Sequence, residues 1–266
     1  MENSCIICEN KKFIPLYEFK INEVDKYKDS NEVIVPLIEK YGEIKIVKCS
    51  YCGFGYVIPK FENNHFDDIY KDDYWTDYQT EVGEIDIRDR VDEFILISKE
   101  RIDYLTPIIS KGKLLDVGCS MGFLVAEAKN SGFDAHGIDL NKYCVEKGKE
   151  MFDVDLISTS IEDYDNNDFD IILSYNTIEH VSRPDNFMLE ISKKINSNGI
   201  VGIGTHDLDC LSHLKEGRSW KHIIPSEHLF YFTEKSLAML GEKYGLKKIY
   251  SNKPIDNLIV VYFQKI

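Results

Sequence analysis

The fold is decided by one stretch, Leu114-Leu115-Asp116-Val117-Gly118-Cys119-Ser120-Met121-Gly122-Phe123-Leu124. Its apolar start predicts a buried strand, its two glycines a sharp turn, and its apolar end the first residues of a helix. Because glycine has no side chain, the backbone of such a turn can approach a ligand, and the helix start offers unpaired N–H groups. The stretch therefore predicts a ligand-binding loop at the edge of a sheet.

Outward from this loop, strand-like and helix-like segments alternate along the chain. Helices are expected over 88–106 and from Met121, Asn141, Pro184 and Glu234. Strands are expected at 113–117, 135–138, 154–157, 169–174, 200–204, 247–250 and 258–263, the last two as an antiparallel hairpin. This alternation predicts an α/β fold with a doubly wound, mostly parallel, seven-stranded sheet.

Two acidic residues narrow the kind of cofactor. The glycine spacing is Gly118-x-Ser120-x-Gly122, which differs from the G-x-G-x-x-G of dinucleotide-binding loops. Asp116 would repel a pyrophosphate but suits a cofactor that carries an ammonium and a sulfonium. Asp139 ends the next strand, where its carboxylate can accept from both ribose hydroxyls. The alternative is an ordinary glycine turn followed by a helix-capping Asp.

The region 113–204 resembles class I S-adenosylmethionine-dependent methyltransferases, in particular those that modify sugars and surface glycans. The matching motifs are Leu115–Gly122, Gly137-Ile138-Asp139, Ser160-Ile161-Glu162-Asp163 and Phe169–Val181. The resemblance implies that the residues holding S-adenosylmethionine are Asp116, Gly118, Ser120 and Gly122 for the methionine part, Asp139 for the ribose, Ser160 and Ile161 for the adenine, and Asn176 beside the methyl group. Leu140 is a further expected cofactor contact. Ser120 replaces a common glycine, and Ser160 replaces an Asp that often contacts the adenine amine, which puts that contact in doubt.

Four of the seven cysteines form two chelating pairs, Cys5-x-x-Cys8 and Cys49-x-x-Cys52. Two such pairs are typical of a closed tetrahedral zinc site, and redox chemistry is the alternative. A closed site has no open position for a substrate, so the expected role of zinc is structural. The region also resembles the zinc-binding N-terminal module of some deoxysugar methyltransferases. The remaining cysteines, Cys119, Cys144 and Cys210, are interpreted as small hydrophobic residues.

The acceptor side is predicted at 220–232, a segment dense in aromatic residues, histidine and proline that follows the fifth strand. It resembles a Glu-His-x-x-x-Phe element of glycan methyltransferases, which implies His228 as the general base and Glu227 as its partner. His206 with Asp207 is the second candidate pair. Weaker candidates for the acceptor pocket are Tyr74, Trp75 and Tyr78. Glu179 and His180 are expected in the first turn of a helix, in a structural or cofactor-supporting role.

The composition limits the partners and the domains. The net charge is −14, from 32 basic and 46 acidic residues, which disfavours a nucleic-acid partner. No apolar run is long enough to span a membrane and the N-terminus does not resemble a signal peptide, so a cytoplasmic location is expected. The expected organisation is a zinc-binding module at 1–60, an acidic aromatic connecting and helical segment at 61–112, and a methyltransferase domain at 113–266 with an acceptor-side insertion at 206–232.

The resemblance favours O-methylation of a sugar or sugar-linked group in surface-polysaccharide (capsule or O-antigen) or nucleotide-sugar biosynthesis. The expected partner is a small-molecule or carrier-linked sugar. Oxygen is preferred because the sequence stops at Ile266, without the large C-terminal domain of the carbon-methylating deoxysugar enzymes. The alternatives are N- or C-methylation of a nucleotide-sugar, and RNA methylation by an enzyme with a zinc module. An NAD(P)-dependent dehydrogenase is disfavoured by the glycine spacing, and a cofactor-free scaffold by the intact loop.

Overall fold

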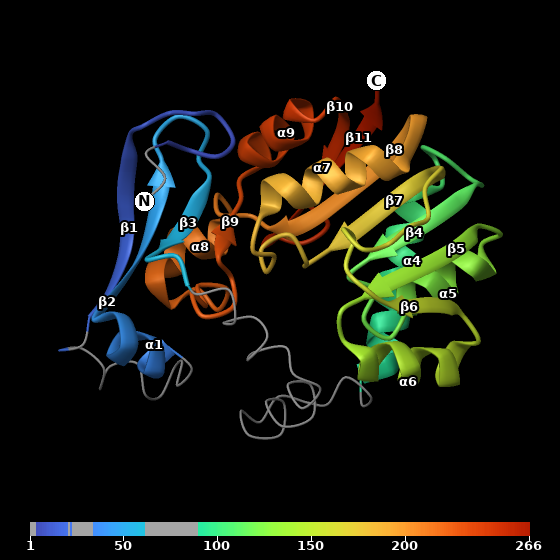
Figure 1. Ribbon diagram of the computed structural model, residues 1–266, viewed down its shortest axis with the longest axis horizontal. Coiled ribbons are helices and arrows are strands. Elements are labelled where there is room, and N and C mark those ends of the chain that lie inside the picture. Colours follow the sequence, from blue (N-terminus) through green and yellow to red (C-terminus); the bar gives the residue numbers. More distant parts are fainter. Residues whose placement is uncertain (1–3, 21, 23–33, 62–89) are drawn as a thin grey trace. The chain divides into compact units, whose positions relative to one another are not determined.

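The computed structural model describes residues 4–20, 22, 34–61 and 90–266 (Figure 1). The aromatic candidates Tyr74, Trp75 and Tyr78, and most of the acidic connecting segment, lie outside the described residues. The chain forms two compact units. Unit 1 consists of Met1–Asn63, Asn176–Met188 and Ile203–Phe263, and unit 2 of Asn64–Tyr175, Leu189–Gly202 and Gln264–Ile266.

Unit 2 is built on parallel strands that begin with the stretch around Gly118. The strands are β4 (Lys113–Val117), β5 (Asp134–Asp139), β6 (Asp155–Ser158) and β7 (Phe169–Tyr175), and the helices are α4 (Val91–Leu105), α5 (Phe123–Asn130) and α6 (Lys142–Phe152). Strand β4 pairs in parallel with β5 and β7, and β5 with β6. Helices α5 and α6 pack on β5 and β6. Strands β4 and β7 are almost fully buried, as expected for a parallel sheet covered on both faces.

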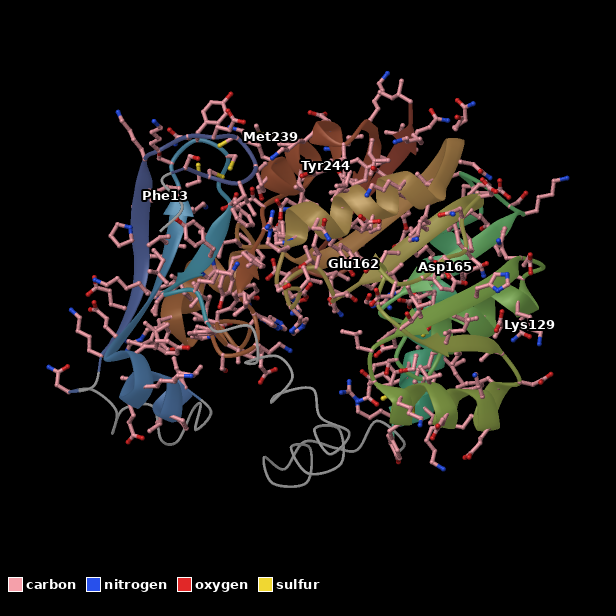
Figure 2. All side chains as sticks on the ribbon, viewed as in Figure 1. Phe13, Lys129, Glu162, Asp165, Met239 and Tyr244 are labelled. Carbon is pink, nitrogen blue, oxygen red and sulfur yellow. The ribbon has the colours of Figure 1, made fainter. Side chains whose placement is uncertain are left out.

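The register of these strands positions the loops at their carboxyl ends. Asp116 pairs with Gly137, and Val117 pairs with Ile138. The residues after β4 and the last residue of β5 therefore lie at the same edge of the sheet. Exposed charged side chains such as Lys129, at the end of α5, lie on the outside of unit 2 (Figure 2).

Unit 1 contains an antiparallel four-stranded sheet in the order β1-β2-β3-β9. Its strands are β1 (Phe13–Lys20), β2 (Glu43–Cys49), β3 (Gly55–Ile58) and β9 (Phe230–Tyr231). Helix α1 (Ile34–Tyr41) packs against β2. Strand β9 pairs through Gly55–Tyr231 and Tyr56–Phe230, so this sheet combines the N-terminal segment with residues of the 220–232 segment.

The second sheet has seven strands in the order β10-β11-β8-β7-β4-β5-β6. Strand β8 (Ile195–His206) directly follows α7 (Pro184–Lys194), and α9 (Glu234–Lys243) precedes β10 (Leu246–Asn252) and β11 (Leu258–Lys265). The short connection 253–257 makes β10 and β11 an antiparallel edge hairpin. The predicted α/β class and seven-stranded sheet are confirmed.

Some elements were not expected from the sequence. These are strand β1 and helix α1, and within the 206–232 segment α8 (Leu211–Glu216) and the 3-10 turn η4 (Gly217–Ser219). Strand β8 begins five residues before the expected position at 200. The expected helical turn at Glu179 and His180 is wrong, because residues 178–180 form a turn and α7 starts only at Pro184.

Within the described residues, no helix is both long and apolar enough to cross a membrane. The expected cytoplasmic location stays a prediction.

Candidate functional site

The glycine loop of unit 2 has the geometry of a cradle. Gly118, Ser120 and Gly122 have φ angles of +80°, +48° and +75°, in the left-handed region that favours glycine. The N–H of Gly118 donates to the carbonyl of Ile138 at 2.8 Å, which ties the loop to β5. A Cβ built on Gly122 would lie 2.9 Å from Leu156 Cδ1, so a larger residue would disturb the packing.

Asp139 holds the loop and retains capacity for a ligand. Its Oδ2 accepts from the N–H of Ser120 at 2.8 Å, and its Oδ1 accepts from the N–H of Asn141 at 2.8 Å. A carboxylate offers about four acceptor positions, so both oxygens can still accept from ribose hydroxyls. Burial raises the pKa of Asp139, and the two backbone N–H groups oppose that shift. The side-chain oxygen of Ser120 is buried and makes no hydrogen bond to the described residues.

Asp116 lies in β4 and is only 4% exposed. Burial raises the pKa of its carboxyl to about 7, with Arg101 lowering it and Asp139 raising it further. A cationic ligand at this edge would compensate the buried charge. Sequence reasoning did not single out Arg101, whose guanidinium lies 4.0 Å from the centre of the Tyr175 ring. Its place in an ordinary amphipathic helix gave no signal.

The remaining cofactor candidates divide between the units. Leu140 is 69% exposed directly after Asp139, and Ile161 is buried at 4%. The Ser160 hydroxyl donates to Asp163 Oδ2 at 2.8 Å and accepts from the Asp163 N–H, which stabilises a local turn. Asn176 belongs to unit 1, has a φ of +51° and donates its N–H to the carbonyl of Gly204 at 2.9 Å.

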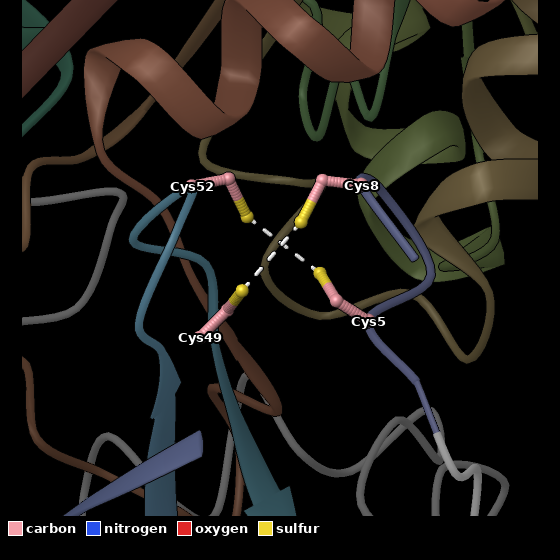
Figure 3. A group of neighbouring side chains, drawn as sticks. All are labelled: Cys5, Cys8, Cys49 and Cys52. Carbon is pink, nitrogen blue, oxygen red and sulfur yellow. Dashed lines mark hydrogen bonds between the residues drawn. The ribbon is translucent and has the colours of Figure 1, made fainter. Parts of the chain in front are cut away.

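The four cysteines of the two pairs converge in unit 1 (Figure 3). Cys5 Sγ lies 3.6 Å from Cys52 Sγ, and Cys8 Sγ lies 3.5 Å from Cys49 Sγ. A hydrogen bond from Cys52 lowers the pKa of Cys5 to about 5. The loops are fixed by the Gly53 N–H donating to the Cys49 carbonyl at 3.1 Å, with Gly53 at a φ of +81°.

This donor set fits zinc better than disulfides. The sulfur separations are far longer than the roughly 2.05 Å of an S–S bond. Four sulfurs held about 2.3 Å from a tetrahedral zinc ion lie about 3.8 Å apart, close to the observed separations. All four sulfurs lie within 4.8 Å of one another. The cysteine group is also joined to the segment Ile203–Phe263 of unit 1, because the hydroxyl of Thr233 donates to the backbone carbonyl of Cys52 at 3.2 Å.

A second group in unit 1, the histidine cluster, comprises His180, His206, His222 and His228. The rings of His206 and His222 stack with centres 3.6 Å apart, and those of His180 and His228 meet edge to face at 4.8 Å. Trp220 borders the cluster, 6.2 Å from His206. The cluster combines the turn after β7, the end of β8 and the 220–232 segment.

Burial keeps these imidazoles neutral. It lowers the pKa of His228 to about 4. Burial together with repulsion from neighbouring imidazoles lowers the pKa of His222 to about 3 and that of His206 to about 2. Burial also lowers the pKa of His180 well below its usual value. Near neutral pH the cluster therefore presents nitrogen lone pairs rather than positive charge.

Glu179 lies beside the cluster and is 1% exposed. Its Oε2 accepts from the Thr205 hydroxyl at 2.9 Å, and its Oε1 lies 3.8 Å from His206 Nε2. Burial raises the pKa of Glu179 to about 7. The sequence placed Glu179 and His180 in a supporting role, and the local turn gave no signal that they meet residues some fifty positions further along the chain.

The predicted acceptor residues lie in this cluster with different partners from those expected. The Nδ1 of His228 bonds to the carbonyl of His222 at 2.9 Å. Glu227 is buried, and its carbonyl bonds to His180 Nδ1 at 3.2 Å. Asp207 accepts from Lys253 at 2.5 Å, so its carboxylate is engaged there, while His206 Nε2 lies 3.8 Å from a carboxylate oxygen of Glu179.

A family model described as a methyltransferase domain matches residues 88–251, more than half of the chain. A ubiquinone biosynthesis O-methyltransferase of Rickettsia typhi is 31% identical over 132 residues, covering 46% of this chain and 53% of the relative. A protein of the same name from Pelagibacter ubique is 36% identical over 100 residues, covering 35% of this chain and 41% of the relative. The chain thus spans about half the length of the curated relatives it matches, or less.

Solved methyltransferases share the fold. A 1,6-didemethyltoxoflavin-N1-methyltransferase of Burkholderia thailandensis, solved with S-adenosylhomocysteine, has a TM-score of 0.59 at 14% identity, covering 84% of this chain and 95% of its own. A Thermotoga maritima S-adenosylmethionine-dependent methyltransferase has a TM-score of 0.55 at 16% identity, covering 72% and 100%. The α/β fold is therefore the Rossmann-like methyltransferase fold.

One prediction is wrong. The expected methylation of a sugar or sugar-linked group in surface-polysaccharide or nucleotide-sugar biosynthesis is contradicted by the curated relatives, which are named for ubiquinone biosynthesis. The expectation rested on the resemblance of the region 113–204, the cysteine pairs and the 220–232 segment to sugar-modifying enzymes. A Glu-His pair among aromatic residues suits several kinds of acceptor. The motif of the methyl donor does not identify the acceptor.

Proposed function

The chain belongs to the methyltransferase-domain family and is an S-adenosylmethionine-dependent methyltransferase, and we propose that it methylates an oxygen of a small hydroxylated aromatic compound. The observation that carries the proposal is the histidine cluster around buried Glu179 in unit 1. Its neutral imidazoles offer lone pairs to a hydroxyl, and the cluster with Trp220 forms aromatic surroundings.

The cofactor is assigned to the residues of the glycine loop and the ends of β4 and β5. Asp116 would compensate the positive charge of the methionine part, and the backbone from Gly118 to Gly122 would approach it closely. Asp139 would accept from the ribose, and Leu140 and Ile161 would give apolar contact to the base. When bound, S-adenosylmethionine supplies a methyl group already activated by its sulfonium.

Oxygen is supported as the acceptor atom by the names of the curated relatives, which are O-methyltransferases. A hydroxylated ring is supported by the weak basicity of the cluster. A phenol, with a pKa of about 10, gives up its proton far more readily than an alcohol does. Buried imidazoles are therefore better matched to a phenolic hydroxyl than to an alcohol.

The reaction needs one proton acceptor, and we assign it to His206. As the acceptor oxygen forms its bond to the methyl carbon, the carbon–sulfur bond breaks with its electron pair going to sulfur, and the hydroxyl proton passes to the imidazole. The His206 side chain is 18% exposed, more than buried His228, so an acceptor can reach it more readily. A phenol that is being alkylated becomes a strong acid, so a weak base suffices.

The proposed acceptor class is tested with the full chain and S-adenosylmethionine carrying a labelled methyl group. Catechol-type and single phenols, matched anilines and simple glycosides are offered, and mass gain and S-adenosylhomocysteine release are measured. We expect labelled methyl ethers from the phenols. Methylation of the anilines alone, or of the glycosides alone, would contradict the proposal.

For the N-terminal segment, we propose a structural zinc ion bound by Cys5, Cys8, Cys49 and Cys52. The sulfur separations of 3.5 and 3.6 Å support it. Metal analysis should find about one zinc per chain in the wild type and in the control Cys144→Ala, whose thiol lies in unit 2. Cys52→Ser should lose that zinc; retention of a full equivalent would refute the assignment.

A further inference from the structure

Glu179, His180 and His228 bring three potential metal ligands together in unit 1. Their donor atoms lie within 4.8 Å of one another. The two segments that carry them are joined by backbone hydrogen bonds, because the N–H groups of Leu229 and Phe230 donate to the Glu179 carbonyl at 3.0 and 3.3 Å. We propose that these three side chains bind a divalent transition-metal ion, which holds the oxygen of the methyl acceptor.

The hydrogen bonds of the two histidines fix the nitrogen that each would offer. The Nδ1 atoms of His180 and His228 lie 3.2 and 2.9 Å from the carbonyls of Glu227 and His222. A carbonyl can only accept, so each Nδ1 carries the proton and each Nε2 of a neutral ring carries the lone pair. Metal-binding histidines are typically held in this way, with the second ring nitrogen donating to a backbone carbonyl.

Glu179 provides a second observation, separate from the convergence of the three side chains, that indicates a bound cation. Its side chain is 2% exposed, and its Oε1 makes no hydrogen bond within the part of the chain that the structure describes. Burying a carboxylate without compensation is costly. The Nε2 atom of His206 lies 3.8 Å from Oε1, beyond hydrogen-bond distance, so it compensates poorly. A cation beside Oε1 would provide the missing charge.

The donor set indicates the class of ion. Two imidazole nitrogens and one carboxylate oxygen favour first-row transition metals such as Mn²⁺, Co²⁺ or Zn²⁺, whereas Mg²⁺ and Ca²⁺ prefer oxygen donors. Three protein ligands leave coordination positions open, as in catalytic rather than structural sites. A hydroxyl group whose oxygen binds the ion would be more acidic than the free hydroxyl. This role in activating the acceptor rests on the proposed O-methylation, while binding of the ion does not.

Unit 2 offers a matched control for surface binding. His136 lies 2.6 Å from an oxygen of Asp155 and 3.2 Å from an oxygen of Asp134, but both carboxylates are largely exposed. It therefore combines the same donor types without a buried carboxylate. If Mn²⁺ binds histidine and carboxylate pairs nonspecifically, His136→Asn should reduce the binding.

The experiment is a Mn²⁺ titration of the full, zinc-loaded chain, in which the electron paramagnetic resonance signal of free Mn²⁺ is measured. Thiolates bind Mn²⁺ poorly, so the cysteine group does not interfere. We expect one tight site in the wild type and in His136→Asn, and affinity at least about tenfold weaker in Glu179→Gln. Unchanged affinity in Glu179→Gln, or binding lost in His136→Asn, would overturn the proposal. If Glu179→Gln does not fold, His180→Asn takes its place with the same expected loss.

The titration contains neither cofactor nor acceptor, so it separates the two proposals. If Mn²⁺ binds as expected but phenols are not methylated, the proposed function fails and the metal site stands. If phenols are methylated and the Glu179→Gln variant binds Mn²⁺ like the wild type, the metal site fails and the proposed function stands.

Discussion

The two units differ in how their site residues are distributed along the sequence. In unit 2, Gly118, Ser120 and Gly122 follow one strand, and Asp139 ends the strand paired with it. In unit 1, the cysteine group and the histidine cluster combine segments from three separate parts of the chain. A site built from one loop and two neighbouring strands can be recognised from local spacing, whereas a site assembled from distant segments depends on tertiary structure.

The largest expected effect tests whether the stability of unit 1 depends on a bound metal ion, whereas that of unit 2 depends on its apolar core. Cys52→Ser should lower Tm by ~10 °C or more, because a structural zinc ion contributes folding free energy directly. Thermal unfolding by circular dichroism measures it, with Cys144→Ala as the control. Equal stability of Cys52→Ser and the wild type would show that the sulfurs converge without needing an ion.

The second prediction concerns chemistry assigned to unit 1 alone. His206→Gln should lower kcat by ~10²–10⁴-fold, because the hydroxyl proton loses its acceptor. The affinity for S-adenosylhomocysteine, measured by calorimetry, should stay the same, since the residues proposed to hold the cofactor, from Asp116 to Ile161, lie in unit 2. His136→Asn is the control for general effects of losing an imidazole. A large loss of cofactor affinity in His206→Gln would mean that the two functions are not divided between the units as proposed.

These contrasts explain which parts of the protein were predictable. The β4–α5 loop was predicted well, because Gly118 and Gly122 need positive φ angles where a buried strand turns into a helix. The cysteine pairs were recognised because each pair is local, although the sequence could not show that β9 joins their sheet. The burial of Glu179 and its contact with Thr205 could not be predicted, because both arise only from the packing of distant segments.

The third prediction tests the cofactor residue that the sequence identified most directly. Asp139→Ala should weaken S-adenosylhomocysteine binding by ~10²-fold, since charge-assisted hydrogen bonds to the ribose and to the Ser120 N–H are lost together. Isothermal calorimetry measures the change. Asp163→Ala, which removes only the bond to Ser160, should have a much smaller effect. Similar losses in both variants would place the ribose elsewhere.

The smallest expected effect lies in the stability of unit 2. Burial raises the pKa of Asp116 to about 7, above the roughly 3.9 expected in the unfolded chain, so between these values the folded state binds more protons. The carboxyl therefore costs no stability below about pH 4, and its cost grows as the pH rises towards 7 and is then constant.

Asp116→Asn removes this cost, so Tm should rise by ~2–4 °C at pH 8 and by less at pH 5. Thermal unfolding at both pH values in the absence of cofactor measures the difference, with the exposed Asp163→Asn as control. The same variant should bind S-adenosylmethionine more weakly, because the compensating charge is gone. A variant that is less stable than the wild type at pH 8 would show that the negative charge of Asp116 is already compensated inside unit 2. A cationic cofactor would then not be needed to explain why an acidic residue is buried at this position.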